Sequence, residues 1–295
     1  LILLLIRPCR MVSKSCDSCF RMKNRCVFTM VRGAGAGNVM FERINYHWRR
    51  LATGSAFALF GIGGAILWLI VFPALHLFVR DVEKRGRLAR VLVSRTFALF
   101  IGYMHRIGIL TYEIKGLEKL QRPGLLILAN HPTLIDIVFL ISLLKNADCV
   151  VRSGLAKNIA TRGAVGATGY ICNDNGADLI NACINSVRSG KNLVIFPEGS
   201  RSKPDHLLPF QRGAANIAVR GRLDITPVLI KCSPPTLSKG LGWYNIPSRR
   251  FHVSIEVLPD ISVEGFSVDT EALAARKLTE YLTHFFETEL NRAGA

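Results

Sequence analysis

The chain has 295 residues, of which 49% are hydrophobic and 20% charged. This composition excludes a disordered or fibrous protein and is sufficient to fill a large core. The 38 Lys and Arg outnumber the 21 Asp and Glu, giving a formal net charge of +17, which suits a nucleic acid, an anionic membrane or an acidic protein partner.

Residues 1–39 are set apart by four crowded cysteines. Their spacing, C-x6-C-x2-C-x6-C, runs from Cys9 to Cys26, and four thiolates can hold one tetrahedral zinc ion. The stretch CDSCFRMKNRC resembles the first half of a fungal binuclear zinc cluster, but the next cysteine is only Cys149. We therefore interpret residues 1–39 as a poorly structured leader or a misassigned upstream segment with no metal. A membrane-tethered, zinc-dependent DNA-binding protein is the alternative.

Residues 40–110 are predicted to form a membrane-attached helical segment. Residues Gly54 to Val79 carry no formal charge. As a helix, this run would measure ~39 Å, more than the ~30 Å hydrocarbon core of a bilayer. Four residues can bend such a helix: Gly61, Gly63, Gly64 and Pro73. Both a spanning helix and a re-entrant hairpin therefore stay open. Because basic residues are denser after the run than before it, we expect the following chain on the cytoplasmic side of an inner membrane.

A second apolar stretch, residues 88–110, is interrupted by basic residues. Arg90, Arg95 and Arg106 recur among Leu, Val, Phe and Ile. This pattern is typical of an amphipathic helix that lies against lipid headgroups.

Residues 111–295 alternate between short apolar runs and helix-like segments. The strand-like runs are TYEIKG, LLILAN, CVVRS, YICN, NLVIFP, ITPVLIK and FHVSIEVL. Helices are predicted over 133–145, 154–163, 176–189, 210–221 and 268–290. The alternation predicts an α/β domain in which a central mixed sheet is flanked by helices.

The stretch LILANHPTLIDIVFL contains two titratable residues, His131 and Asp136, in an otherwise apolar run. Pro132 suits the first turn of a helix, so His131 is expected at a strand-to-helix junction, where α/β folds place ligands. On one continuous helix, the two side chains would be ~140° apart. They can meet only if His131 precedes the helix and Asp136 leans back toward it. Such a pair is either a structural helix cap or a general base with its orienting carboxylate.

A second polar group follows the strand NLVIFP. Glu198, Gly199, Ser200 and Arg201 stand at the carboxyl end of this strand. Glycine permits close backbone approach, and the arginine fork suits phosphate or carboxylate. The alternative is an ordinary surface turn with an Arg–Glu pair.

Two motifs in this order, NHPTLID and then FPEGSRS, resemble the signatures of the glycerolipid acyltransferase family, of the lysophosphatidic acid acyltransferase type. Those signatures are H-x4-D and F-P-E-G-[TS]-R-S. Three further stretches resemble weaker family blocks: GYICNDN, LPFQRGAANIA and ITPVLI. The resemblance spans roughly residues 90–260 and is to bacterial members.

The resemblance implies acyl transfer from an acyl carrier protein or coenzyme A thioester to a lipid hydroxyl. His131 would act as the general base, Asp136 would hold its ring, and residues 198–201 would bind the polar head of the acceptor. Neither a metal nor another cofactor is implied. The expected partners are the thioester donor, the lipid acceptor and the membrane, and not a nucleic acid.

One position departs from the family pattern. Asn175 stands where an arginine that helps to hold the acceptor phosphate is expected. Arg201, Arg212 or Arg152 can supply the missing cation. Two alternatives stay open: acylation of a specialised lipid of the aryl-polyene type, and a non-catalytic lipid-binding relative.

Overall fold

The computed structural model describes residues 35–154, 161–173, 178–202, 209–240, 242, 244–266 and 270–292, with side chains from Arg43 onward. The four N-terminal cysteines, Asn175 and residues 155–160 of the predicted helix 154–163 lie outside the described residues. The chain divides into two compact units, Leu1–Phe41 and Glu42–Ala295, and the second contains the sheet and the helices around it.

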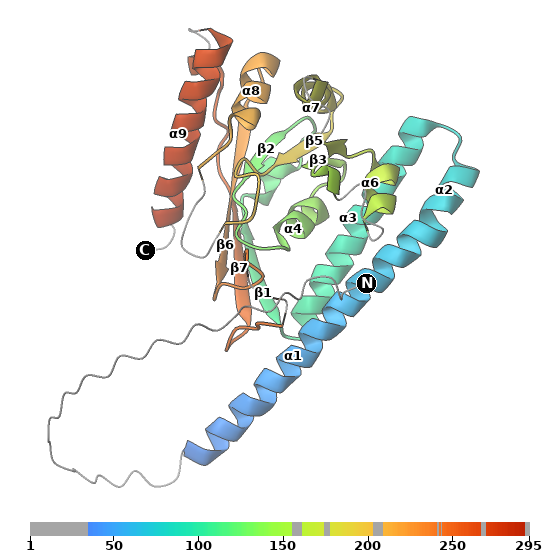
Figure 1. Ribbon diagram of the computed structural model, residues 1–295, viewed down its shortest axis with the longest axis vertical. Coiled ribbons are helices and arrows are strands. Elements are labelled where there is room, and N and C mark those ends of the chain that lie inside the picture. The colour runs from blue at the N-terminus through green and yellow to red at the C-terminus, as the bar shows by residue number, and fades with distance from the viewer. Residues whose placement is uncertain are drawn as a thin grey trace, which may run out of the picture. The chain divides into compact units, whose positions relative to one another are not determined.

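A seven-stranded mixed sheet forms the centre of the second unit (Figure 1). The strands are β1 (Leu110–Lys115), β2 (Leu126–Ala129), β3 (Ala147–Val151), β4 (Ile171–Cys172), β5 (Asn192–Ile195), β6 (Ile225–Ser233) and β7 (Phe251–Val257). Their order is β1-β7-β6-β2-β5-β3-β4, and every neighbouring pair is parallel except β6 and β7. Each strand contains part of one predicted strand-like run, so the prediction of a mixed α/β sheet is confirmed.

Helices cover both faces of the sheet and enclose two apolar cores. The helices of the domain are α4 (Asp136–Leu143), α6 (Arg162–Thr168), α7 (Asp178–Arg188), α8 (Arg212–Gly221) and α9 (Glu271–Arg292). Successive side chains of a strand point to opposite faces, and β2 shows this directly. Ile127 and Ala129 enter the core shared with α4, whereas Leu126 and Leu128 enter the core shared with α7, α8 and α9. Because β2 is buried on both faces, it reads as a continuous apolar run.

The helix bounds correct one prediction. Helix α4 begins at Asp136 instead of residue 133, because the Asp136 carboxylate accepts the backbone N–H of Thr133 and holds the preceding residues in a turn. Of the helix predicted over 154–163, Gly154 is helical and residues 155–160 lie outside the described residues. A further helix, α6, begins at Arg162; its sequence, RGAVGAT, has two glycines and β-branched residues, so its helix propensity is low and it was not predicted. Helices α7, α8 and α9 match their predicted ranges to within a few residues.

The segment before the sheet is a long helical hairpin. It consists of α1 (Gly35–Ile66), the π-helical η1 (Leu67–Val71), α2 (Phe72–Phe78) and the returning helix α3 (Val82–Arg106). Residues Arg43–Phe78 run as one helix, so the chain does not reverse at the glycines or at Pro73, which lies in the first turn of α2, directly after the π turn. The chain reverses after Phe78 instead, where the Asp81 side chain accepts the N–H of Lys84 at 2.9 Å and caps α3.

Within the described residues, one helix is long and apolar enough to cross a membrane, Arg43–Phe78, and its most apolar 18 residues have a mean hydropathy of 2.2. It buries a narrow face of small residues, including Ala52 and Ala56, against the rest of the unit. Large apolar side chains on its other faces are exposed: Leu59, Ile62, Ile66, Leu69, Ile70, Leu77 and Phe78. This helix therefore presents an uncovered apolar surface.

The packing of α9 generates a stability prediction. Leu278 is fully buried, whereas Leu273 on the same helix is 41% exposed. We expect Leu278→Ala to lower the free energy of unfolding by about 2–5 kcal/mol, because it leaves a cavity. The matched control, Leu273→Ala, should cost only about 0.5 kcal/mol. Urea unfolding of the detergent-solubilised protein measures both, and equal losses would contradict this placement of α9.

Candidate active site

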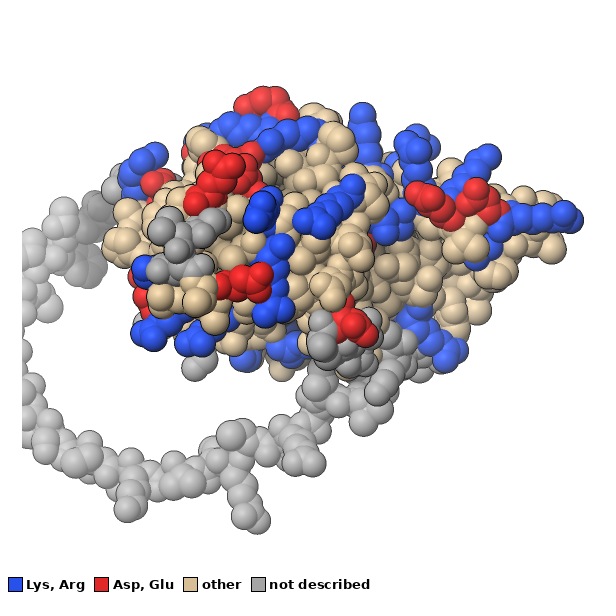
Figure 2. Space-filling view, turned by 90° about the horizontal axis from the view of Figure 1, so that it is seen from above, with Lys and Arg blue, Asp and Glu red and all other residues tan. Residues whose placement is uncertain are grey.

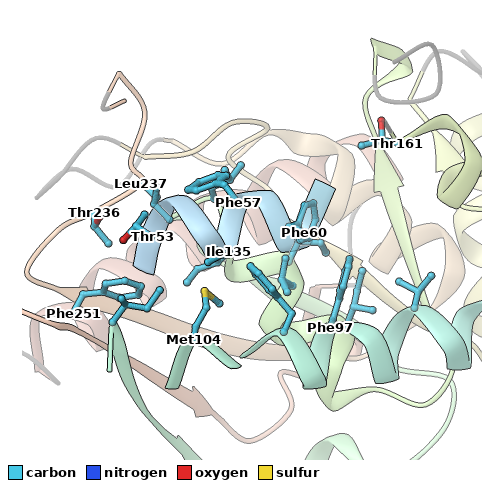
Figure 3. A pocket seen from close by; sticks show the side chains of 18 of the residues that line it. Thr53, Phe57, Phe60, Phe97, Met104, Ile135, Thr161, Thr236, Leu237 and Phe251 are labelled. Carbon is cyan, nitrogen blue, oxygen red and sulfur yellow. The ribbon is translucent and has the colours of Figure 1, made fainter. Parts of the chain in front are cut away.

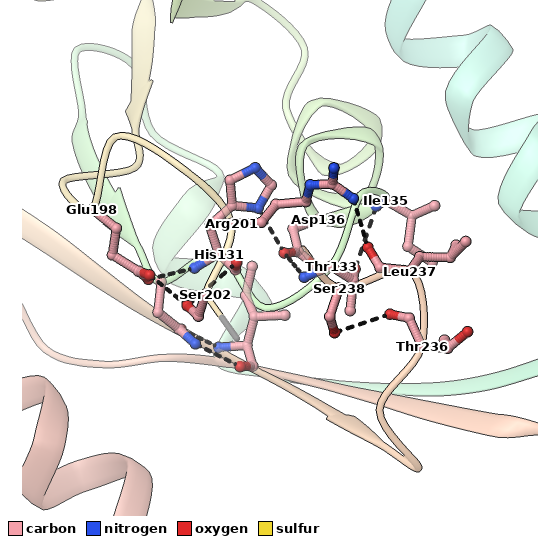
Figure 4. A network of polar contacts seen from close by, with 12 residues as sticks. His131, Thr133, Ile135, Asp136, Glu198, Arg201, Ser202, Thr236, Leu237 and Ser238 are labelled. Carbon is pink, nitrogen blue, oxygen red and sulfur yellow. Dashed lines mark hydrogen bonds and ion pairs between the residues drawn. The ribbon is translucent and has the colours of Figure 1, made fainter. Parts of the chain in front are cut away.

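The histidine and aspartate of the first motif meet at the end of β2. His131 lies in the turn after the strand, and Asp136 is the first residue of α4. Asn130 positions this turn, because its amide pairs with both the N–H and the carbonyl of Ile230 at 2.7 and 2.8 Å. His131 Nδ1 lies 2.9 Å from Asp136 Oδ2 (Figure 4). The two side chains therefore meet as their spacing requires, with His131 before the helix and Asp136 in its first turn.

The carboxylate of Asp136 is completely buried and fixes the hydrogen on the histidine ring. It accepts the Thr133 N–H at 2.7 Å and also the Thr133 hydroxyl. Burial raises the pKa of Asp136, and hydrogen bonds from His131 and Thr133 oppose this effect. Because an ionised carboxylate only accepts, Nδ1 of His131 must donate, and the Nε2 lone pair is left to accept a proton.

The histidine ring is also held by an aromatic contact. Phe196, which follows β5, stacks on it with ring centroids 4.1 Å apart and planes 20° from parallel. The His131 side chain is 17% exposed, whereas that of Asp136 is 0% exposed. The pair is thus rigid on its buried side and accessible on the other.

Glu198 joins the two motif loops to each other. Its carboxylate is buried, accepts the His131 N–H at 2.8 Å and accepts the Ser202 hydroxyl. The Ser202 N–H in turn donates to the His131 carbonyl at 2.8 Å. The carboxylate therefore points into the protein, between the loops (Figure 4).

The next three residues of the second motif form a turn beside cationic side chains. Gly199 has a φ of +67°, a conformation that favours glycine. Arg201 Nη1 donates to the Leu237 carbonyl at 2.8 Å. Lys239 Nζ lies 3.4 Å from Ser200 Oγ, and Arg152 donates to the Gly199 carbonyl. Three cations therefore gather around this turn.

Other predicted contacts are placed less directly. Arg212 is exposed at the start of α8, and its neighbour Gln211 donates its N–H to the Pro197 carbonyl at 2.7 Å, which brings this helix end to the turn. The position of Asn175 lies outside the described residues. Within the described ranges, His, Cys, Asp and Glu side chains form no group of three that could hold a metal ion.

Four contributors were not predicted: Thr133, Phe196, Ser202 and Lys239. The first three lie inside the two motifs, so their closeness in sequence to His131 or Glu198 could have indicated them. Lys239 comes from the loop after β6, far from either motif in the chain. No local pattern marks it, because only the fold brings this loop to Ser200.

An apolar cavity of about 330 Å³ opens beside the pair (Figure 3). It lies between α1, α3, α4 and the loop before β7, and Phe57, Phe60, Phe97 and Met104 line it. Leu134, Ile135 and Leu237 also line it, and the Leu134 N–H donates to the Leu237 carbonyl at 3.2 Å. The carbonyl that binds Arg201 thus belongs to the cavity wall.

A histidine–carboxylate pair, a cationic turn and an apolar cavity lie together on a mixed α/β sheet. This combination fits an acyltransferase that binds a fatty chain and a polar acceptor side by side.

The comparisons with known proteins agree with this class. A family model described as Acyltransferase matches residues 111–231. The 1-acyl-sn-glycerol-3-phosphate acyltransferase of Helicobacter pylori is 34% identical over 170 residues, which cover 55% of this chain and 70% of that protein. The enzyme of the same name from Saccharomyces cerevisiae is 26% identical over 207 residues, which cover 67% of this chain and 66% of that protein.

A solved structure shares the fold. The crystal structure of the 1-acyl-sn-glycerophosphate (LPA) acyltransferase PlsC from Thermotoga maritima matches with a TM-score of 0.64 and 18% identity, covering 86% of this chain and 98% of that chain. Given the sequence relatives, the chain belongs to the glycerolipid acyltransferase family that includes the 1-acyl-sn-glycerol-3-phosphate acyltransferases.

The contacts of Glu198 generate a prediction about the loops. Glu198→Ala leaves the His131 N–H and the Ser202 hydroxyl without this acceptor, so we expect the free energy of unfolding to fall by about 1–3 kcal/mol. Glu198→Gln still offers an oxygen to the N–H and should cost less. Thermal and urea unfolding measure both variants. A Glu198→Ala protein as stable as the wild type would contradict a stabilising role for the contacts of Glu198 with His131 and Ser202.

The raised pKa of Asp136 generates a pH prediction. The folded carboxyl holds its proton more tightly than the unfolded one, so its contribution to stability is greatest below the ordinary value of 3.8 and is lost as pH rises through the raised pKa. Because asparagine does not ionise, Asp136→Asn should gain stability relative to the wild type as the pH rises from about 3.8 through the raised pKa of Asp136.

Unfolding midpoints of both proteins across this pH range measure the difference. Asp178→Asn, at an exposed position at the start of α7, is the control for replacing an aspartate. A wild-type-to-variant difference for Asp136→Asn that stays constant with pH would contradict the prediction.

Proposed function

We propose that the protein transfers a fatty acyl group from an acyl carrier protein or coenzyme A thioester to the free hydroxyl of a lysophosphatidic acid-like acceptor. The observation that carries this proposal is the His131–Asp136 contact of 2.9 Å beside the apolar cavity. Relatives described as 1-acyl-sn-glycerol-3-phosphate acyltransferases support the choice of acceptor.

The pair supplies general base catalysis in this proposal. His131 Nε2 takes the proton of the acceptor hydroxyl as the oxygen attacks the thioester carbonyl carbon. The tetrahedral intermediate collapses to the ester and expels the thiolate, which takes the proton back from the imidazolium. The ionised carboxylate of Asp136 stabilises the imidazolium between these steps and keeps the ring in position. Because both substrates are bound with the hydroxyl next to the thioester carbonyl, the acyl group can pass directly between them without a covalent acyl-enzyme.

The cationic turn supplies the contact to the acceptor phosphate. Arg201 Nη1 donates to the Leu237 carbonyl, and this contact fixes the orientation of the guanidinium. The other N–H groups of the guanidinium can then donate to the phosphate. Lys239 and Arg152 reach the same turn and add charge. We assign Ser200 and the Gly199 backbone to the same headgroup, and Glu198 to positioning His131. Arg212, at the nearby start of α8, is the remaining candidate for the cation absent at Asn175.

The apolar cavity supplies the contact to a fatty chain. Its walls are almost entirely apolar, and Phe57, Phe60 and Phe97 close one part of it (Figure 3). Burying a chain releases about 0.8 kcal/mol per methylene group, so such a cavity favours long acyl groups over short ones. Its wall includes Ile135 and Leu237, next to the pair and to Arg201.

Membrane attachment through the helical hairpin completes the proposal. The exposed apolar side chains of Arg43–Phe78 suit a bilayer, and the basic residues around the hairpin suit anionic headgroups on the cytoplasmic side of an inner membrane. Figure 2 shows Lys and Arg spread over one face of the molecule, including the projecting end of the hairpin. We therefore retain three parts: a leader (1–39), a membrane-attached segment (40–110) and an acyltransferase domain (111–295).

The direct test is His131→Ala in the full-length protein. Acylation of lysophosphatidic acid, followed by mass spectrometry with acyl carrier protein and coenzyme A thioesters in parallel, should fall by at least about 10²–10⁴-fold, because the general base is lost. The matched control is His284→Ala, at an exposed position on α9, which should retain wild-type turnover.

Two results would contradict the proposal. Wild-type turnover by His131→Ala would remove His131 from the chemistry. Tight lipid binding by the wild type without acylation of any acceptor, phosphorylated or not, would instead support a non-catalytic lipid-binding relative.

A further inference from the structure

A second cavity, of about 730 Å³, lies farther along the hairpin than the apolar one, nearer to its turn. It is formed by η1, α2, the first turns of α3 and helix α6, and it shares no lining residue with the apolar cavity. Its wall combines apolar side chains of the hairpin, such as Trp68 and Phe72, with charged ones. Four are basic and one is acidic: Arg85, Arg90, Arg162, Lys191 and Glu83.

Arg90 is a buried cation at the inner end of this cavity. It is 6% exposed, and it donates to the Asn146 side-chain oxygen and the Thr168 carbonyl, both at 2.7 Å. Both acceptors are neutral, and no described carboxylate lies within ion-pair distance of it. Asp148 and Glu83 attract it through space without forming an ion pair with it. Asp148 is engaged by the Ser186 hydroxyl at 2.7 Å and by Lys191 at 3.7 Å, and Glu83 is exposed to solvent. A buried charge with this little compensation is unfavourable unless an anion approaches it.

The outer wall of the cavity holds a second arginine in a fixed orientation. The Arg162 guanidinium lies over the Trp68 ring, 4.6 Å from its centroid. Gly163 makes this arrangement possible, because a Cβ there would come within 2.1 Å of the Trp68 ring. This cation–π contact uses none of the N–H donors of Arg162, so they can still bind an anion.

The cavity opens beside the most exposed apolar part of the hairpin. Leu69, Ile70, Leu77 and Phe78 are between 63% and 80% exposed, and they come from the same η1 and α2 turns as Trp68 and Phe72. A group that enters the cavity from this side would therefore carry apolar chains along those residues while its polar head reaches the arginines.

We propose that this cavity binds the phosphate headgroup of an anionic phospholipid and is distinct from the acceptor site. Phosphate oxygens match the fork of an arginine, and two arginines with a neighbouring lysine can hold one phosphate through several charge-assisted hydrogen bonds. The negative charge of the bound headgroup would compensate the positive charge of Arg90. It would also hold the hairpin at the membrane surface. The lipid source of the phosphate rests on the membrane attachment proposed above, whereas the phosphate site itself does not.

The test titrates the full-length protein in a non-ionic detergent with dihexanoylphosphatidylglycerol. Dihexanoylphosphatidylcholine and inorganic phosphate are the comparison ligands, and calorimetry at constant ionic strength measures affinity. Arg162→Gln should weaken phosphatidylglycerol binding by about tenfold, because it removes charge-assisted hydrogen bonds. The matched control is Arg95→Gln on α3, which removes the same charge from an exposed position outside the cavity and should leave the affinity unchanged.

The outcomes separate the possibilities. Equal weakening by Arg162→Gln and Arg95→Gln would overturn the site, because general attraction would then explain binding. Inorganic phosphate that binds as tightly as phosphatidylglycerol, with the same dependence on Arg162, would overturn the lipid assignment. Selective loss of phosphatidylglycerol binding in Arg162→Gln alone supports the proposal. None of these measurements requires turnover, so they are independent of the acyltransferase assay.

Discussion

The geometry of the candidate active site depends on the buried carboxylate of Asp136. It ends the turn after β2 by accepting the Thr133 N–H, and it orients the His131 ring through Nδ1. Burial raises the pKa of this carboxyl, and the hydrogen bonds that surround it favour the ionised form. One group thus sets the local backbone, the start of α4 and the tautomer of the histidine. The hydrogen bonds from His131 and Thr133 offset the cost of burying this carboxylate.

The rest of the site is arranged around this pair by contacts between loops. Glu198 ties the His131 backbone to Ser202, and Phe196 covers the ring. The loop after β6 closes over the same place, because the Leu237 carbonyl accepts from both Arg201 and Leu134. A cationic turn therefore lies against the wall of an apolar cavity. An amphipathic substrate, with a charged head and a fatty chain, matches that combination.

The helical hairpin links this site to a membrane surface in our proposal. It supplies Phe57 and Phe60 to the apolar cavity, while its outer residues are uncovered. The same hairpin forms a wall of the basic cavity around Arg90 and Arg162. Acyl-chain binding and headgroup binding would thus use two parts of one element, so a lipid bound at one part can influence the position of the other.

The sequence by itself determined the seven strands, the mixed α/β class, the family and the two motif loops, because apolar periodicity and short motifs are local properties of the chain. It left two roles open for the His131–Asp136 pair, a helix cap or a general base, and it did not predict α6, because RGAVGAT has weak helix propensity. Only the tertiary structure turned Glu198 inward, brought Lys239 to Ser200 and left Arg90 buried among neutral partners. These features join residues that are distant in the chain, and only the packing of the sheet, its loops and the hairpin brings them together.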